Sequence, residues 1–130
     1  MTPASIALIR ESFARLQPHM DEFGRVFYAR LFAANPGMRV LFPRTIDAQA
    51  HAFTKMLELA VKMLDMQEQL IPMIHYLGER HVALNVKPAH FRPFGEALLW
   101  ALESTLRDEF TPEVRRAWRD AYAFMTDHMT

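Results

Sequence analysis

Apolar residues recur at steps of three and four along most of this chain, and that spacing constrains its fold more than any other feature. One face of an α-helix returns about every 3.6 residues, whereas one face of a strand returns every second residue. The hairpin signals Asn-Gly and Asp-Gly do not occur in the sequence. The spacing therefore predicts an all-α domain. Its six expected helices contain the apolar stretches 6–16, 20–31, 53–64, 70–81, 91–106 and 114–129.

The expected helices have recognisable starts. Thr2-Pro3 opens the first, and Asp47 is a possible cap for the third. The last has the clearest start, because Thr111 can cap it and Pro112 suits the first helical position. Linking segments are expected around Gly37, Phe42-Pro43 and Asn85-Val86.

The composition supports a packed helical core. Ala, Leu and Met number 17, 14 and 9, whereas Val, Ile and Thr number 6, 5 and 7. Fifteen basic and fifteen acidic side chains leave no net charge, which argues against a protein that binds nucleic acid or an anionic membrane surface. Cysteine is absent, which excludes disulfides, thiolate metal sites and cysteine nucleophiles.

Nothing in the sequence predicts a membrane span or a second domain. The longest stretch without Asp, Glu, Lys or Arg runs for ten residues from Gln69 to Gly78, too short to cross a bilayer. The first residues, Met1 to Ala4, do not resemble a signal peptide. We therefore expect one cytoplasmic domain over residues 1–130.

Polar residues on apolar helix faces are the candidates for chemistry, because burial requires a partner. His81 follows Leu70, Ile74 and Leu77 at helical steps. It is either a core histidine that donates to a backbone carbonyl or a metal ligand.

Two further candidates lie on the second and third expected helices. Tyr28 follows Phe27, and Gln49 lies one turn before Phe53 on the same face. Taken alone, Tyr28 is a core tyrosine and Gln49 a solvent-facing residue at a helix end. His51 lies about 200° around the helix from Gln49, so the two side chains do not face one pocket.

The order of motifs along the whole chain resembles a known family. The motifs are Phe27-Tyr28, Asn35-Pro36, Leu41-Phe42, Gln49, Leu77-Gly78-Glu79-Arg80-His81, Val86-Lys87-Pro88, Gly95-Glu96 and Ala117-Trp118 through Tyr122. Tyr28 and Phe42 are 14 residues apart, and Gln49 and His81 are 32 apart. This arrangement resembles a bacterial single-domain globin of the flavohaemoglobin-like branch, which includes Vitreoscilla-type and methanotroph haemoglobins.

The resemblance implies a three-on-three helical sandwich around a non-covalent b-type haem. His81 would be the proximal iron ligand, its second ring nitrogen oriented by a carbonyl near Leu77. Tyr28 and Gln49 would be the distal hydrogen-bonding pair, with Phe53 beside them. Arg80 would reach a haem propionate or remain a solvated surface residue. The remaining residues implied to line the haem are Phe42, Leu57, Leu77, Val86, Phe91, Phe94 and Leu98.

The implied function is reversible binding of O2, and also of CO and NO, for oxygen transport or scavenging. Phe91 stands where flavohaemoglobins have a proximal tyrosine, and Phe53 replaces the usual distal leucine. The glutamate of their proximal network and their reductase domain would fall beyond Thr130. Three alternatives stay open: a nitric oxide dioxygenase served by a separate reductase, a haem-based gas sensor, and a helical interaction domain without a cofactor.

Overall fold

The computed structural model describes residues 1–129, which form helices and connecting turns without a strand. This confirms the all-α prediction. The long helices are α1 (Pro3–Leu16), α2 (Met20–Ala34), α3 (Ile46–Lys62), α4 (Gln67–Ala83), α5 (Phe91–Leu106) and α6 (Pro112–Met129). Four short 3₁₀ helices connect them: η1 (Gln17–His19), η2 (Pro36–Leu41), η3 (Pro88–His90) and η4 (Arg107–Glu109).

Threonines cap the starts of three long helices. The side chains of Thr2, Thr45 and Thr111 accept hydrogen bonds from backbone N–H groups three residues ahead. The expectation of Asp47 as the cap of α3 is wrong, because the helix begins one residue earlier and Asp47 lies in its first turn. There its carboxylate still faces the positive end of the helix dipole.

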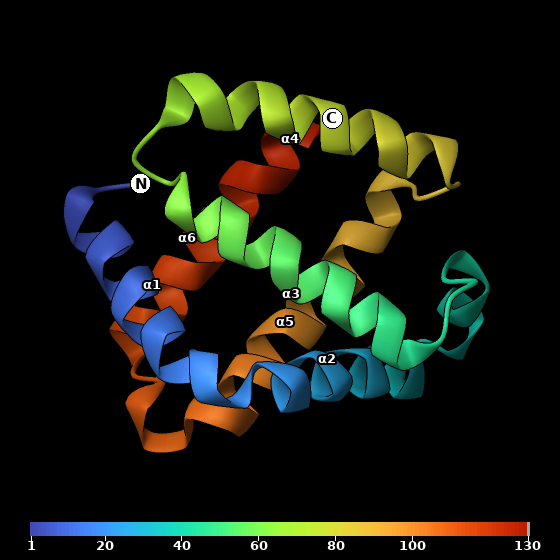
Figure 1. Cartoon of the computed structure of the whole chain (residues 1–130), viewed down its shortest axis with the longest axis horizontal. Helices are drawn as coiled ribbons and strands as arrows, with labels where there is room; N and C mark the ends of the chain where they lie inside the picture. Colours follow the sequence, from blue (N-terminus) through green and yellow to red (C-terminus); the bar gives the residue numbers. More distant parts are fainter. Residues whose placement is uncertain (130) are drawn as a thin grey trace.

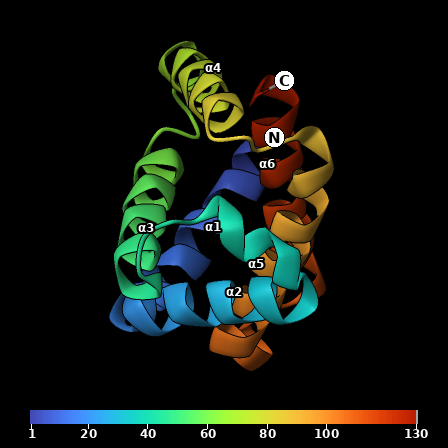
Figure 2. The ribbon, with the colours of Figure 1, turned by 90° about the vertical axis from the view of Figure 1, so that its right-hand side faces the viewer.

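The helices pack in a few dominant pairs. Helix α2 packs against α3 and α5, α1 packs against α6, and α4 packs against α6. Figure 1 shows α4 running across one end of the molecule, with α3 in front of α5 and α6. In Figure 2, α3 and α5 stand on opposite sides, with α2 below and α4 above them. Helices α3 and α4 follow one another in the sequence but are not one of the packed pairs.

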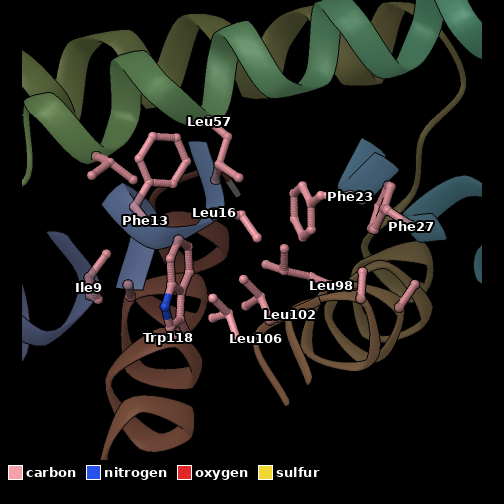
Figure 3. Packing of buried hydrophobic residues seen from close by; sticks show 14 of the residues in the cluster. Ile9, Phe13, Leu16, Phe23, Phe27, Leu57, Leu98, Leu102, Leu106 and Trp118 are labelled. Carbon is pink, nitrogen blue, oxygen red and sulfur yellow. The ribbon is translucent and has the colours of Figure 1, made fainter. Parts of the chain in front are cut away.

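The centre of the core lies where α1, α2, α5 and α6 meet. Figure 3 shows Phe13 and Trp118 beside one another and Leu98, Leu102 and Leu106 below Phe23. Burial of such side chains contributes roughly 1.5–3 kcal/mol each. The indole Nε1 of Trp118 donates to the hydroxyl of Ser12 at 2.8 Å, so the buried polar atoms of this pair are satisfied.

Helix α4 approaches α6 closely at Gly78. A Cβ atom at this glycine would overlap the backbone carbonyl of Met129, at the end of α6. The absence of a side chain therefore permits the two backbones to touch. Because α6 is the main partner of α4, this contact helps to set the position of α4. No helix within residues 1–129 is long and apolar enough to span a membrane.

Candidate functional site

The contact between α2 and α3 brings two predicted site residues together. A Cβ atom at Gly24 of α2 would lie 3.0 Å from Cβ of Ala50 on α3, so the two helices meet closely here. One turn beyond Gly24, Tyr28 points from α2 toward the first turns of α3. There the Nε2 group of Gln49 donates to the hydroxyl oxygen of Tyr28 at 3.4 Å.

The Tyr28 side chain is buried and keeps its proton. Only 3% of the residue is exposed, and this burial raises the pKa of Tyr28 to about 12, although the Gln49 hydrogen bond lowers it. The hydroxyl oxygen accepts from Gln49, and no acceptor for the hydroxyl proton lies among the described residues. Tyr28 is therefore a neutral donor with one hydrogen bond still to make.

Phenylalanine rings surround this hydroxyl. Phe53 of α3 stacks on Phe27 with ring centroids 4.4 Å apart and planes 12° apart, and it meets Tyr28 edge-on at 5.9 Å. Phe42, which follows η2, lies 5.4 Å from Tyr28 and 5.9 Å from Phe94 of α5. The stack holds Phe53 against α2 and makes the surroundings of Tyr28 apolar.

His81 projects from α4, near the helix's end. Its imidazole is half-buried, and burial lowers its pKa, which favours the neutral ring. Its Nδ1 atom is buried without a hydrogen-bond partner among the described residues. The expected hydrogen bond to a carbonyl near Leu77 is therefore not formed, because the orientation of the ring leaves Nδ1 without an acceptor within reach.

The other predicted residues differ in burial. Leu57, Val86 and Leu98 are buried, Arg80 is exposed, and Leu77, Phe91 and Phe94 are intermediate. The backbone N–H of Val86 donates to the carbonyl of His81 at 2.8 Å, which ties the segment after α4 to the end of that helix.

An apolar cavity of about 90 Å³ lies between α1, α3, α5 and α6, and Phe53, Leu57 and Leu98 line it. The predicted site residues did not include the others that line it, among them Met56, Tyr122 and Met125. Tyr122 and Met125 continue the apolar face of α6 through Trp118, so helical periodicity could have found them. A larger open hollow of about 530 Å³ lies at Met1, Ile6 and Met66, and no predicted site residue lines it.

His81 and Tyr28 fit a metal-containing cofactor that brings most of the metal's ligands itself. Within residues 1–129 there is no set of three or more His, Cys, Asp or Glu side chains able to hold a metal ion. One neutral imidazole on α4 and one buried hydroxyl donor on α2 remain. A haem would bring most of its own ligands and would need one side chain from the protein, for which His81 is available.

The histidines outside this arrangement have other surroundings. His51 is exposed on α3, in accord with its expected direction away from Gln49. His75 of α4 lies against His128 of α6, with ring centroids 6.3 Å apart.

A family model and curated relatives both match most of this chain. The family model described as Globin matches residues 25–129. A flavohemoprotein of Deinococcus radiodurans is 30% identical over 99% of this chain and 33% of its own length. Flavohemoprotein A of Dictyostelium discoideum is 32% identical over 94% of this chain and 31% of its own length. The chain thus spans about a third of the length of the curated relatives that it matches.

A solved structure has the same fold. The crystal structure of a hexacoordinated heme protein from an anhydrobiotic tardigrade superposes with a TM-score of 0.89. The match covers 99% of this chain and 92% of that one at 20% sequence identity.

Proposed function

The chain belongs to the globin family, and from this we propose that it holds a non-covalent b-type haem between α3 and α4 and reversibly binds O2, CO or NO there. The family match and the unfilled donor capacity of Tyr28 support the proposal. Residues 1–130 would act as one globin domain, and the proposed compartment is the cytoplasm.

His81 is the residue that we assign to the iron. A neutral imidazole offers one lone pair to a metal, and burial keeps the ring of His81 neutral. Reduced haem iron supplies the position at which a diatomic gas binds. Phe42, Phe53, Leu57, Leu77, Val86, Phe91, Phe94 and Leu98 are proposed to surround the group, and exposed Arg80 is proposed to meet a propionate.

Tyr28 carries the functional assignment. Its hydroxyl proton is unused among the described residues, and its oxygen is already held by Gln49. A polar diatomic ligand that accepts a hydrogen bond from this hydroxyl would satisfy a donor that otherwise has no partner in an apolar pocket. O2 carries partial negative charge when it is bound and CO much less, so the pair favours retention of O2.

The proximal side favours ligand binding over oxidative chemistry. The hydroxyl of Tyr122 donates to the backbone carbonyl of Phe91 at 2.5 Å, and the Phe91 side chain has no hydroxyl to offer to His81. The Nδ1 atom of His81 therefore has no carboxylate or hydroxyl support among the described residues. An unsupported imidazole pushes less electron density toward iron, which disfavours the activation of a bound oxidant.

A second candidate, nitric oxide dioxygenase, is favoured by the flavohemoprotein relatives. In that reaction NO and O2 combine to nitrate, and one electron per turnover from a separate reductase restores the reduced protein. Tyr28 and Gln49 would hold O2 in either function. Sustained NO consumption with a cellular reductase separates the two, because simple binding consumes NO only once per protein.

The first experiment is the absorption spectrum of the haem-supplemented protein in ferric, reduced, oxygenated and carbonmonoxy forms. We expect a Soret band, one broad visible band in the reduced protein and two sharp bands with O2. His81→Ala should lose this reduced spectrum, whereas His51→Ala, on the exposed side of α3, should keep it. Failure of the parent protein to take up haem would overturn the proposal.

A further inference from the structure

Two segments on one side of the molecule carry exposed cations. Residues 36–46 contain Arg39 and Arg44, and residues 80–92 contain Arg80, Lys87 and Arg92, yet neither segment contains an Asp or Glu. Figures 1 and 2 show η2 and the turn after α4 at the same side of the fold. We call Arg39, Arg44, Arg80 and Lys87 the basic rim.

The basic rim differs from most other basic side chains in having no acidic partner. Among residues 1–129, six Lys and Arg side chains outside the rim form ion pairs with carboxylates, including Arg10 with Asp65 and Arg15 with Glu109 at 2.8 Å. Within residues 1–129 no carboxylate pairs with a member of the rim. The flanking acids do not neutralise it: Asp47 pairs with Arg25, and Glu79 forms no ion pair with Arg80.

Exposed apolar side chains accompany these cations. Val40 is 84% exposed, Val82 is 70% exposed and Leu84 is 53% exposed. Binding a haem propionate would employ the charge of Arg80 but gives no use to these apolar side chains. Exposed apolar residues among unpaired charges are typical of a surface that another protein covers.

Both segments are held in place by local contacts. The guanidinium of Arg39 donates to the carbonyls of Phe42 and Arg44 and lies 5.3 Å from the ring centroid of Phe32. Asn85 adopts a left-handed conformation with φ 66°, and the N–H of Lys87 donates to Nδ1 of His90 at 3.0 Å. An ordered surface loses less conformational entropy when it binds.

We propose that the basic rim, with Val40, Val82 and Leu84, is the docking surface for an acidic one-electron carrier protein. This inference rests on the proposed function, because the carrier delivers its electron to the ferric haem. Phe42 lies within residues 36–46, and His81 lies within residues 80–92. A protein docked on these two segments is therefore close to the proposed haem site. The carrier would lose one electron and a bound ferric haem would gain it, so the transfer would need no proton.

A protein fits this surface better than an anionic lipid bilayer. The rim cations belong to a chain with no net charge and would give only a local attraction to an anionic membrane. The surface has neither a basic amphipathic helix nor an exposed large aromatic side chain to insert. An acidic protein meets the charges and also covers the three small apolar residues.

The test measures electron transfer from a plant-type [2Fe–2S] ferredoxin, reduced beforehand and freed of reductant, to the ferric haem protein in a stopped-flow spectrometer. We expect the second-order rate constant to fall about tenfold as ionic strength rises from roughly 0.01 to 0.3 M. The double variant Arg44→Glu/Lys87→Glu should be about tenfold slower than the parent at low salt and nearly insensitive to salt.

The matched control is Arg116→Glu/Arg119→Glu, which makes the same change in net charge on exposed residues of α6. The first turns of α6 lie at the other end of the molecule in Figure 1, so we expect a change of less than about twofold. Equal slowing by both variants would show a general charge effect and overturn the docking surface. A rate constant that does not depend on salt would overturn it as well.

A binding measurement separates this proposal from the proposed function. Titration of ¹⁵N-labelled protein with the ferredoxin should shift amide signals within residues 36–46 and 80–92. Such shifts in a protein that takes up no haem would overturn the proposed function and leave the surface in place. A normal haem spectrum with no shifts in these segments, or tighter binding to phosphatidylserine vesicles than to the ferredoxin, would overturn the surface alone.

Discussion

The chemistry of Tyr28 is set by its burial among phenylalanine rings. The hydroxyl oxygen is held by Gln49, while the proton remains available. Replacement of Tyr28 by Phe removes this donor with little change in shape. We expect the O2 dissociation rate to rise about tenfold or more, since one such hydrogen bond contributes about 0.5–1.5 kcal/mol and more toward a charged acceptor.

Stopped-flow displacement of O2 by CO measures that rate. The CO dissociation rate should change by less than about threefold in the same variant, because bound CO is less polar. Tyr76→Phe, on the exposed face of α4, is the matched control. An O2 dissociation rate in Tyr28→Phe equal to that of the parent would contradict the assignment.

Alkaline pH should destabilise the fold through the same residue. Folding raises the pKa of Tyr28 from 10.0 to about 12 because the phenolate is poorly solvated. The stabilisation is complete below pH 10 and is lost as pH rises from 10 through 12, to a limit of about 2–3 kcal/mol. Urea unfolding between pH 9 and 12 should show a steeper loss in the parent than in Tyr28→Phe. Parallel curves would argue against burial of this hydroxyl.

At the scale of single helices, Gly78 determines how near α4 lies to α6. An alanine in a helix interior normally stabilises by roughly 0.5–1 kcal/mol relative to glycine. Here a Cβ atom would overlap the carbonyl of Met129, so we expect Gly78→Ala to destabilise the protein and to speed haem loss. Gly37→Ala is the control, since a Cβ atom there meets nothing within 4 Å.

Haem loss to an excess of a haem-scavenging apoprotein gives the rate, and thermal unfolding gives the stability. Helix α4 carries His81 three residues after Gly78, so a shift of α4 reaches the iron ligand. If Gly78→Ala proves more stable than the parent and retains haem equally well, the contact does not position α4.

The helices were predictable from the sequence because their apolar spacing directly reflects which face packs. The cap of α3 was not, since Thr45 and Asp47 are both good capping residues and only the path of the chain before the helix selects Thr45. The candidate site was accessible only through the family resemblance. Tyr28 alone looks like a core residue, and its meeting with Gln49 depends on the close approach of α2 and α3 at Gly24.

The sequence was misleading about the second nitrogen of His81. A carbonyl one turn earlier always exists in a helix. Whether Nδ1 of the ring points at that carbonyl depends on the side-chain rotamer and the helix geometry. The basic rim was also hidden, because a net charge of zero says nothing about how the charges are distributed.

For the whole molecule, haem binding and folding should be linked. The proposed haem contacts α3, α4 and α5, and α3 and α4 are not packed against one another. A ligand that binds only the folded chain stabilises it in proportion to the logarithm of its concentration. We expect the Tm of the parent to rise with added haem, and that of His81→Ala to rise much less. A Tm that is independent of haem would contradict the linkage.

The pairing of α4 with α6 also fixes an order of events during synthesis. Residues 67–83 are made well before residues 112–129, yet α6 is the main helix against which α4 packs. Because a nascent chain emerges from its N-terminus, α2 and α3 can meet on the ribosome while α4 still lacks its support. The side of the pocket that bears Tyr28 should therefore form first. Stable haem capture should wait until α6 has emerged.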